Sequence, residues 1–123
     1  MKLNAGIITH KLDETRKFYT EIFGFGLTFD SDWFILLHTP DQSSSIGFLV
    51  PDHPSQASIF QPEFQGKGVF ITMEVEDVDA EYERIKALQI PITVDLREEP
   101  WGDRHFAITD PNGIGVDVVT HHA

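Results

Sequence analysis

The chain contains no cysteine, which excludes disulfides, thiolate metal ligands and a cysteine nucleophile. No apolar run approaches the roughly 20 residues of a membrane-spanning helix, and polar residues follow Met1 too soon for a secretion signal. Basic residues are scarce, because 9 lysines and arginines stand against 20 acidic residues, for a net charge of −11. We therefore expect a cytoplasmic protein with no nucleic-acid and no membrane partner. The charge favours the approach of a cationic ligand, with plain solubility as the alternative explanation.

The chain contains the same order of predicted secondary-structure elements twice. Its 123 residues suffice for one domain, residues 1–123, with a modest core. The first half predicts a strand over residues 3–9, a helix from Asp13 to Gly24, and strands over 25–29, 33–38 and 45–50. The second half predicts a strand over 69–75, a helix capped by Asp77 or Asp79, and strands over 92–96, 104–109 and 115–119.

This repetition predicts the α+β class, with two βαβββ modules forming a curved mixed sheet with a cup-shaped cleft. We place the first module at about residues 1–50, a connection at 51–68 and the second module at 69–121. The connection is rich in proline and glycine and shows no periodic pattern.

The turn that the sequence predicts most clearly joins the last two predicted strands. It has the sequence Asp110-Pro111-Asn112-Gly113. Proline has a preset φ that suits a turn, while asparagine and glycine tolerate the positive φ that closing a hairpin requires. Trp101, between Pro100 and Gly102, lies at the mouth of this hairpin and is a candidate wall for a binding site.

Alternation along the strands assigns side chains to the two faces of the sheet. We expect Val69, Ile71, Met73 and Val75 to pack on a helix, together with Val116 and Val118. The opposite, cup-facing side would then receive Asn4, Phe70, Thr72, Glu74, Asp117 and Val119. Glu74 is expected to be an exposed strand-end carboxylate.

The run Asp13…Phe18-Tyr19…Phe23-Gly24-Phe25, followed by the Asp110–Gly113 turn and Asp117, resembles the vicinal-oxygen-chelate superfamily. This group contains glyoxalase I, bleomycin-resistance proteins and extradiol dioxygenases. The resemblance covers nearly the whole chain and implies paired βαβββ modules. It also implies a homodimer with clefts at or near the subunit interface.

Metal-dependent members of the superfamily place His, Gln or Glu ligands on the first and last strands of each module. The resemblance puts these positions at Asn4, Phe70 and Asp117, with a fourth near residues 47–49. A divalent site needs several His or carboxylate ligands that converge on one point, and only Asp117 qualifies. We therefore predict no metal site and no cofactor.

Within the superfamily, the bleomycin-resistance proteins resemble the end of the chain best. The shared residues are Pro100-Trp101-Gly102, Arg104, Phe106-Ala107 and Asp110-Pro111. Asp103 is an extra residue between Gly102 and Arg104. In those proteins the tryptophan and a phenylalanine after the first helix stack on the flat rings of the drug, and the matching residues here are Trp101 and Phe29. Two aromatic walls suit a planar, weakly cationic ligand.

The remaining polar candidates are histidines. His105 alternates with Phe106 and so lies on the opposite face of its strand, beside Trp101, where it would form a hydrogen bond to a ligand. His121 and His122 are expected to be a frayed terminus. Trp33 is expected to pack rather than to bind.

Together these features predict a metal-independent small-molecule-binding protein, similar to drug-sequestering antibiotic-resistance proteins. The predicted ligand-binding residues are Phe29, Trp101, Phe70, Thr72, His105, Asp117 and Asn4. One alternative is a glyoxalase-like lyase or isomerase, or an extradiol-type dioxygenase, with a degenerate or relocated metal site. A third is an interaction module in which Trp101 is buried at a dimer seam.

Overall fold

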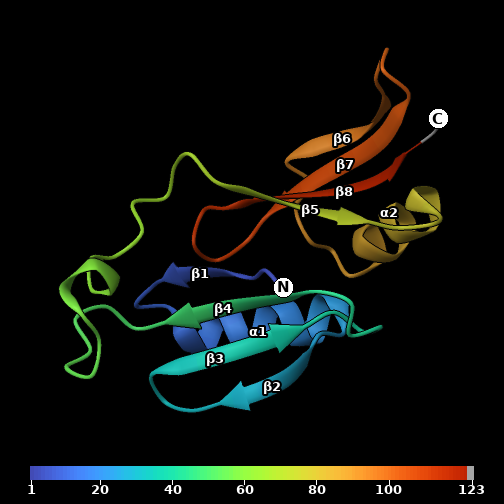
Figure 1. Cartoon of the computed structure of the whole chain (residues 1–123). Helices are drawn as coiled ribbons and strands as arrows, with labels where there is room; N and C mark the ends of the chain where they lie inside the picture. The colour runs from blue at the N-terminus through green and yellow to red at the C-terminus, as the bar shows by residue number, and fades with distance from the viewer. Residues whose placement is uncertain (122–123) are drawn as a thin grey trace. The chain divides into compact units, whose positions relative to one another are not determined.

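The computed structural model describes residues 1–121 and divides the chain into two compact units, Met1–Gln65 and Gly66–Ala123. Each unit contains one helix and one open four-stranded mixed sheet (Figure 1). The predicted α+β class with two βαβββ modules is confirmed. Among the described residues, neither long helix has the length and apolar character needed to cross a membrane.

The first unit is built around helix α1. Its elements are β1 (Ala5–Ile8), α1 (Leu12–Phe23), β2 (Gly26–Asp30), β3 (Phe34–His38), β4 (Ser45–Leu49) and a short 3₁₀ turn, η1 (Ser58–Phe60). The strand order is β1-β4-β3-β2, with β1 parallel to β4 and the other pairs antiparallel. Tyr19 of α1 stacks on Phe48 of β4 at 5.5 Å between ring centroids, and both side chains are fully buried.

The second unit repeats this plan. Its elements are β5 (Phe70–Glu74), α2 (Val78–Ala87), β6 (Val94–Glu98), β7 (Asp103–Thr109) and β8 (Gly115–His121). The strand order is β5-β8-β7-β6, with β5 parallel to β8. Tyr82 of α2 meets the buried Phe106 of β7 edge to face, at 5.3 Å.

Two of the three helix ends predicted from the sequence agree with the structure. Asp77 caps α2, because its side chain accepts a hydrogen bond from the Ala80 N–H at 3.1 Å. Gly24 ends α1 in the left-handed conformation, at φ 69°. The prediction that Asp13 caps α1 is wrong, since the helix begins at Leu12 and Asp13 instead contacts Arg16.

The predicted faces of the second sheet are present except at Val69, which lies before β5 and is 45% exposed. Val116 and Val118 are buried, while Phe70 lies opposite Gly115 and Thr72 lies opposite Asp117 in the parallel pair. Val119, which alternation placed with Asp117, is buried as well.

The hairpin turn after β7 forms as the sequence predicts. Asp110 is only 4% exposed, and its Oδ1 accepts hydrogen bonds from the backbone N–H of Asn112 at 2.8 Å and of Ile114 at 2.9 Å. Gly113 has a φ of 81°, which a side chain would strain. The turn therefore depends on one buried carboxylate as well as on its glycine.

Replacement of Asp110 by Ala should lower the free energy of unfolding by about 2 kcal/mol, because two backbone N–H groups lose a charged acceptor. Asp110→Asn keeps an acceptor oxygen and should lose less. Urea unfolding followed by circular dichroism measures both variants. Equal stability of the Ala variant and the unaltered protein would contradict this account of the turn.

Candidate functional site

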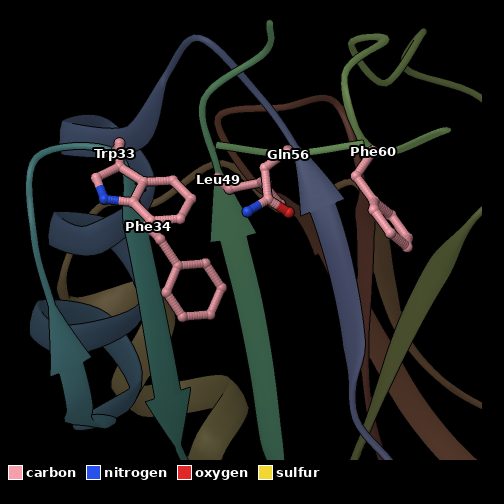
Figure 2. A pocket seen from close by; sticks show the side chains of 5 residues that line it. All are labelled: Trp33, Phe34, Leu49, Gln56 and Phe60. Carbon is pink, nitrogen blue, oxygen red and sulfur yellow. The ribbon is translucent and has the colours of Figure 1, made fainter. Parts of the chain in front are cut away.

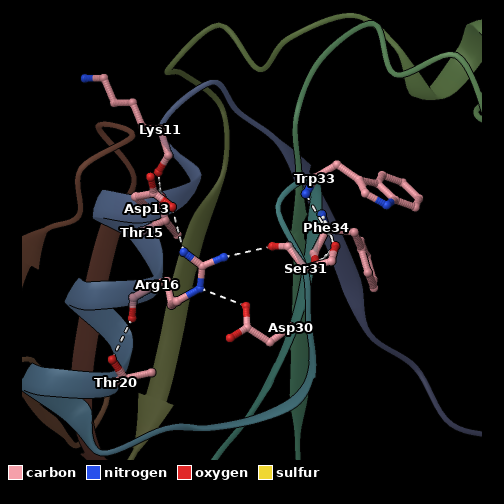
Figure 3. Close-up of polar contacts among 9 residues, drawn as sticks. All are labelled: Lys11, Asp13, Thr15, Arg16, Thr20, Asp30, Ser31, Trp33 and Phe34. Atoms are coloured by element: carbon pink, nitrogen blue, oxygen red, sulfur yellow. Dashed lines mark hydrogen bonds and ion pairs between the residues drawn. The ribbon is translucent and has the colours of Figure 1, made fainter.

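An arginine on α1 fixes the turn between β2 and β3. The Arg16 guanidinium donates from Nη1 to Asp13 Oδ1 at 2.7 Å, from Nε to Asp30 Oδ1 at 3.0 Å, and from Nη2 to the Ser31 carbonyl at 2.9 Å (Figure 3). Its side chain is 23% exposed. Arginine suits this position because its planar fork serves several acceptors at once.

Ser31, at the turn that Arg16 binds, in turn holds the backbone at the start of β3. Its hydroxyl accepts from the backbone N–H of Trp33 at 3.3 Å and of Phe34 at 3.0 Å, and donates to the Phe34 carbonyl at 2.9 Å (Figure 3). The first residues of β3 are therefore held by a turn that is itself held by the helix.

Residues at the start of β3 line a pocket of about 300 Å³ in the first unit. Figure 2 shows its lining side chains, which are Trp33, Phe34, Leu49, Gln56 and Phe60. Phe34 and Leu49 are direct neighbours in the sheet and alternate with residues that pack on α1. The pocket thus lies on the face of the sheet away from the helix.

The lining is almost entirely apolar. Three of its five side chains carry aromatic rings, and the Gln56 carboxamide is the polar group among them. One face of the Trp33 indole is covered by His53, whose ring is stacked on it at 4.0 Å and 15°. A rigid indole with an adjoining phenyl ring provides a surface for flat ligands.

The connection forms one wall of this pocket and is attached to the first unit at its far end. The Phe64 N–H donates to the Ile8 carbonyl at 2.8 Å, and the His10 ring contacts Glu63. This contact with His10 holds the pKa of Glu63 below its ordinary value. Within the connection, the Gln56 N–H donates to the His53 carbonyl at 3.0 Å and the Phe60 N–H to the Ala57 carbonyl at 2.9 Å, although no periodic pattern marks these residues.

The sequence missed most of this pocket. Trp33 was expected to pack, yet it both packs on His53 and faces the pocket. Of the predicted site residues in the first unit, Phe29 is half exposed and its ring lies 5.7 Å from that of Phe34, whereas Asn4 is exposed just before β1. The signal that the sequence offers for this pocket is Phe60, an aromatic residue inside a stretch that otherwise looks like a loop.

In the second unit, alternation along the strands puts the predicted residues Phe70, Thr72, His105 and Asp117 on the face of the sheet away from α2, and Trp101 lies in the turn before β7. Phe70 and Trp101 are 72% and 67% exposed, and Thr72 is exposed. His105 Nδ1 lies 2.6 Å from Asp117 Oδ1, which joins the two predicted polar residues in one pair. The other ring nitrogen, Nε2, is buried and has no hydrogen-bond partner among the described residues, with Glu99 Oε2 at 3.8 Å.

The expectation that His121 is frayed is wrong, because it ends β8 and binds two carboxylates; His122 lies outside the described residues. His121 Nδ1 is 2.6 Å from Asp103 Oδ1, and its Nε2 is 2.6 Å from Glu74 Oε1. These carboxylates, Asp103 first, raise the pKa of His121 above its ordinary 6.5. Glu74 is exposed, as predicted, and is in addition paired.

The residues at the superfamily's metal positions do not fit a divalent ion. A side chain at Gly47 would meet the ring of Phe34, whose Cε2 lies 3.3 Å from the place of a Cβ atom. Phe70 has no donor atom, and Asp117 is engaged by His105. Among the described residues, no group of three His or acidic side chains could hold a metal ion.

Comparisons with known proteins agree with the fold. Residues 4–118 match the model of the glyoxalase/bleomycin resistance protein/dioxygenase superfamily. No curated protein is similar enough in sequence to count as a match.

Solved structures share the architecture at low identity. A lactoylglutathione lyase from Agrobacterium tumefaciens is 23% identical, with 98% of this chain and 92% of that chain covered and a TM-score of 0.79. TnmS3, an antibiotic-binding protein from Streptomyces sp. CB03234, is 17% identical, with 99% and 96% covered and a TM-score of 0.77. A bleomycin-binding protein in complex with bleomycin is 19% identical, with 99% of each chain covered and a TM-score of 0.69.

Replacement of Arg16 by Gln should loosen the β2–β3 turn and lower the free energy of unfolding by about 1 kcal/mol, since exposed acceptors lose a charged donor. The fluorescence emission of Trp33 should shift to the red as its strand end becomes more mobile. This emission is measured in a Trp101→Phe background, so that Trp33 is the only tryptophan. Lys17→Gln, on the exposed neighbouring position of α1, is the matched control. Identical emission and stability in the Arg16 and Lys17 variants would contradict the role given to Arg16.

Proposed function

The chain belongs to the glyoxalase/bleomycin resistance protein/dioxygenase superfamily, and we propose that it binds a small planar molecule without using a metal. The observation that carries this proposal is the pocket of the first unit, with Trp33, Phe34 and Phe60 around one amide. Ligand sites in proteins are mostly apolar, with few polar groups that set orientation. At about 300 Å³ the pocket is at the small end of the usual range for such sites.

The charge and the hydrogen-bonding groups of the lining side chains indicate which chemical group of a ligand fits the pocket. Within residues 1–121, no charged side chain lines the pocket, so an uncharged ring system suits it better than a cationic group. The Gln56 carboxamide donates to Ser55 Oγ at 3.2 Å, which leaves its oxygen as an acceptor for a ligand N–H or O–H. A flat heteroaromatic ring with a donor on its edge meets both requirements.

The residues predicted from the sequence extend this proposal. Phe29 would continue the aromatic wall beside Phe34. In the second unit, we propose that the exposed rings of Phe70 and Trp101 contact a ligand, with Thr72, His105 and Asp117 as polar partners, and Asn4 as a further polar contact in the first unit. The acidic balance of the chain would favour a ligand that also carries a positive group.

Two of the similar structures are an antibiotic-binding protein and a bleomycin-binding protein with its drug, which supports binding without catalysis. We propose a homodimer, as the superfamily resemblance implies. The second candidate function is a lyase, isomerase or dioxygenase with a relocated metal site. It is favoured by the similarity to a lactoylglutathione lyase and by the half-buried His105–Asp117 pair.

Titration with flat aromatic compounds, including bleomycin, the neutral acridone and the cationic proflavine, should quench the fluorescence of Trp33. Phe60→Ala should weaken binding about tenfold, because a stacked ring contributes roughly 1–1.5 kcal/mol. Ile59→Ala is the matched control, since Ile59 is 76% exposed in the same turn and does not line the pocket. If no compound quenches, or if both variants bind like the unaltered protein, the pocket is not the site.

Metal analysis separates the two candidate functions. Protein purified without a His tag and without chelator should hold far less than one zinc, nickel, manganese or iron per chain, because the ligand positions do not fit a divalent ion. Added divalent metal should leave the quenching by the flat compounds unchanged. One tightly held metal per chain would instead support the enzyme.

A further inference from the structure

The exposed indole of Trp101 is held by a carboxylate that the resembled motif lacks. Trp101 Nε1 donates a hydrogen bond to Asp103 Oδ2 at 3.0 Å. Asp103 is the extra residue between Gly102 and Arg104, at the start of β7. The residue by which this chain departs from the Pro-Trp-Gly-Arg pattern is therefore the one that orients its tryptophan.

The second oxygen of Asp103 connects it to His121. These two residues are direct partners across β7 and β8, and His121 Nδ1 lies 2.6 Å from Asp103 Oδ1. His121 Nε2 lies 2.6 Å from Glu74 Oε1 on β5. One imidazole thus bridges carboxylates on the two strands that flank its own, and Asp103 transmits its position to Trp101.

The bridge requires a proton on each ring nitrogen. A carboxylate only accepts hydrogen bonds, so His121 donates to both Asp103 and Glu74 only as an imidazolium, whereas the neutral ring donates to one. Asp103 and then Glu74 raise the pKa of His121 above 6.5, and His121 in turn lowers the pKa of Asp103. The complete bridge is therefore present below pH 6.5 and is lost as the pH rises through the raised pKa.

Other charged groups on this face form a separate set. His105 contacts Asp117 at 2.6 Å and lies 3.8 Å from Glu99, while Arg97 Nε is 2.6 Å from Glu99 Oε1. His105 reaches Asp103 only through its charge. Changes at His105 should therefore affect the bridge weakly, although both histidines lie on the same face.

We propose that His121 is a positioning residue for Trp101, holding the indole through Asp103 most firmly when it is protonated and bound to both carboxylates, and less firmly when it is neutral and donates to only one of them. The reading of Trp101 as a ligand contact rests on the proposed function, whereas its coupling to His121 rests on the three contacts above. If Trp101 contacts a flat ligand, that contact is firmest in mildly acidic solution and weakens as the pH rises. The ligand chemistry in question is a planar ring stacked on the exposed indole.

The test uses the whole chain labelled with 5-fluorotryptophan and no ligand. The chain has two tryptophans, so its ¹⁹F spectrum has two resonances, and Trp101→Phe identifies which belongs to Trp101. Between pH 5 and 9 the Trp101 resonance should shift with a midpoint above 6.5. It should lose this titration in His121→Asn and keep it in His105→Asn, the matched control on the same face.

A second variant, Glu74→Gln, tests the proposal independently in case His121→Asn does not fold. The Glu74 side chain is 71% exposed, so Glu74→Gln should leave the fold intact, and it should lower the midpoint because one of the two carboxylates is removed. The proposal is overturned if the Trp101 resonance does not titrate, if it still titrates in His121→Asn, or if Glu74→Gln leaves the midpoint unchanged. Because no ligand is present, these outcomes are independent of whether the pocket binds flat compounds.

Discussion

The contact between the Arg16 guanidinium and the β2–β3 turn is the constraint on which the candidate site depends. A helix residue reaches the carboxylate of Asp30 and the carbonyl of Ser31, and the Ser31 hydroxyl then fixes the backbone of Trp33 and Phe34. Aromatic rings bind flat molecules well only when they are held in place, because the entropy of ordering them would otherwise offset the contact. The helix therefore supplies the rigidity that the pocket needs.

The two units share the same module but carry different side chains on the sheet face away from the helix. In the first, the face of the sheet away from the helix is apolar and is covered in part by the connection, which gives a half-open pocket. In the second, the corresponding face carries paired charges, with His105 bound to Asp117 and His121 bound to Asp103 and Glu74. Repetition of the fold thus does not imply repetition of chemistry.

The sequence predicted the fold well because the signals that mark it are local. Helix stops, the Asp110 turn and the alternation of β5 and β8 each depend on residues close together in the chain. The pocket depends instead on Gln56 and Phe60 reaching Trp33 across some 20 to 30 residues of chain, through backbone hydrogen bonds that no pattern records. The predicted Asp13 cap failed for a related reason, since its carboxylate is attracted to Arg16 one turn later.

The most direct test of the central claim is to map where a flat ring binds. Acridone added to ¹⁵N-labelled protein should shift the amide resonances of Trp33, Phe34 and residues 56–60, and these shifts should saturate together. Shifts confined to the second unit, or the absence of saturable shifts, would contradict the account of a helix-supported aromatic pocket as the ligand site.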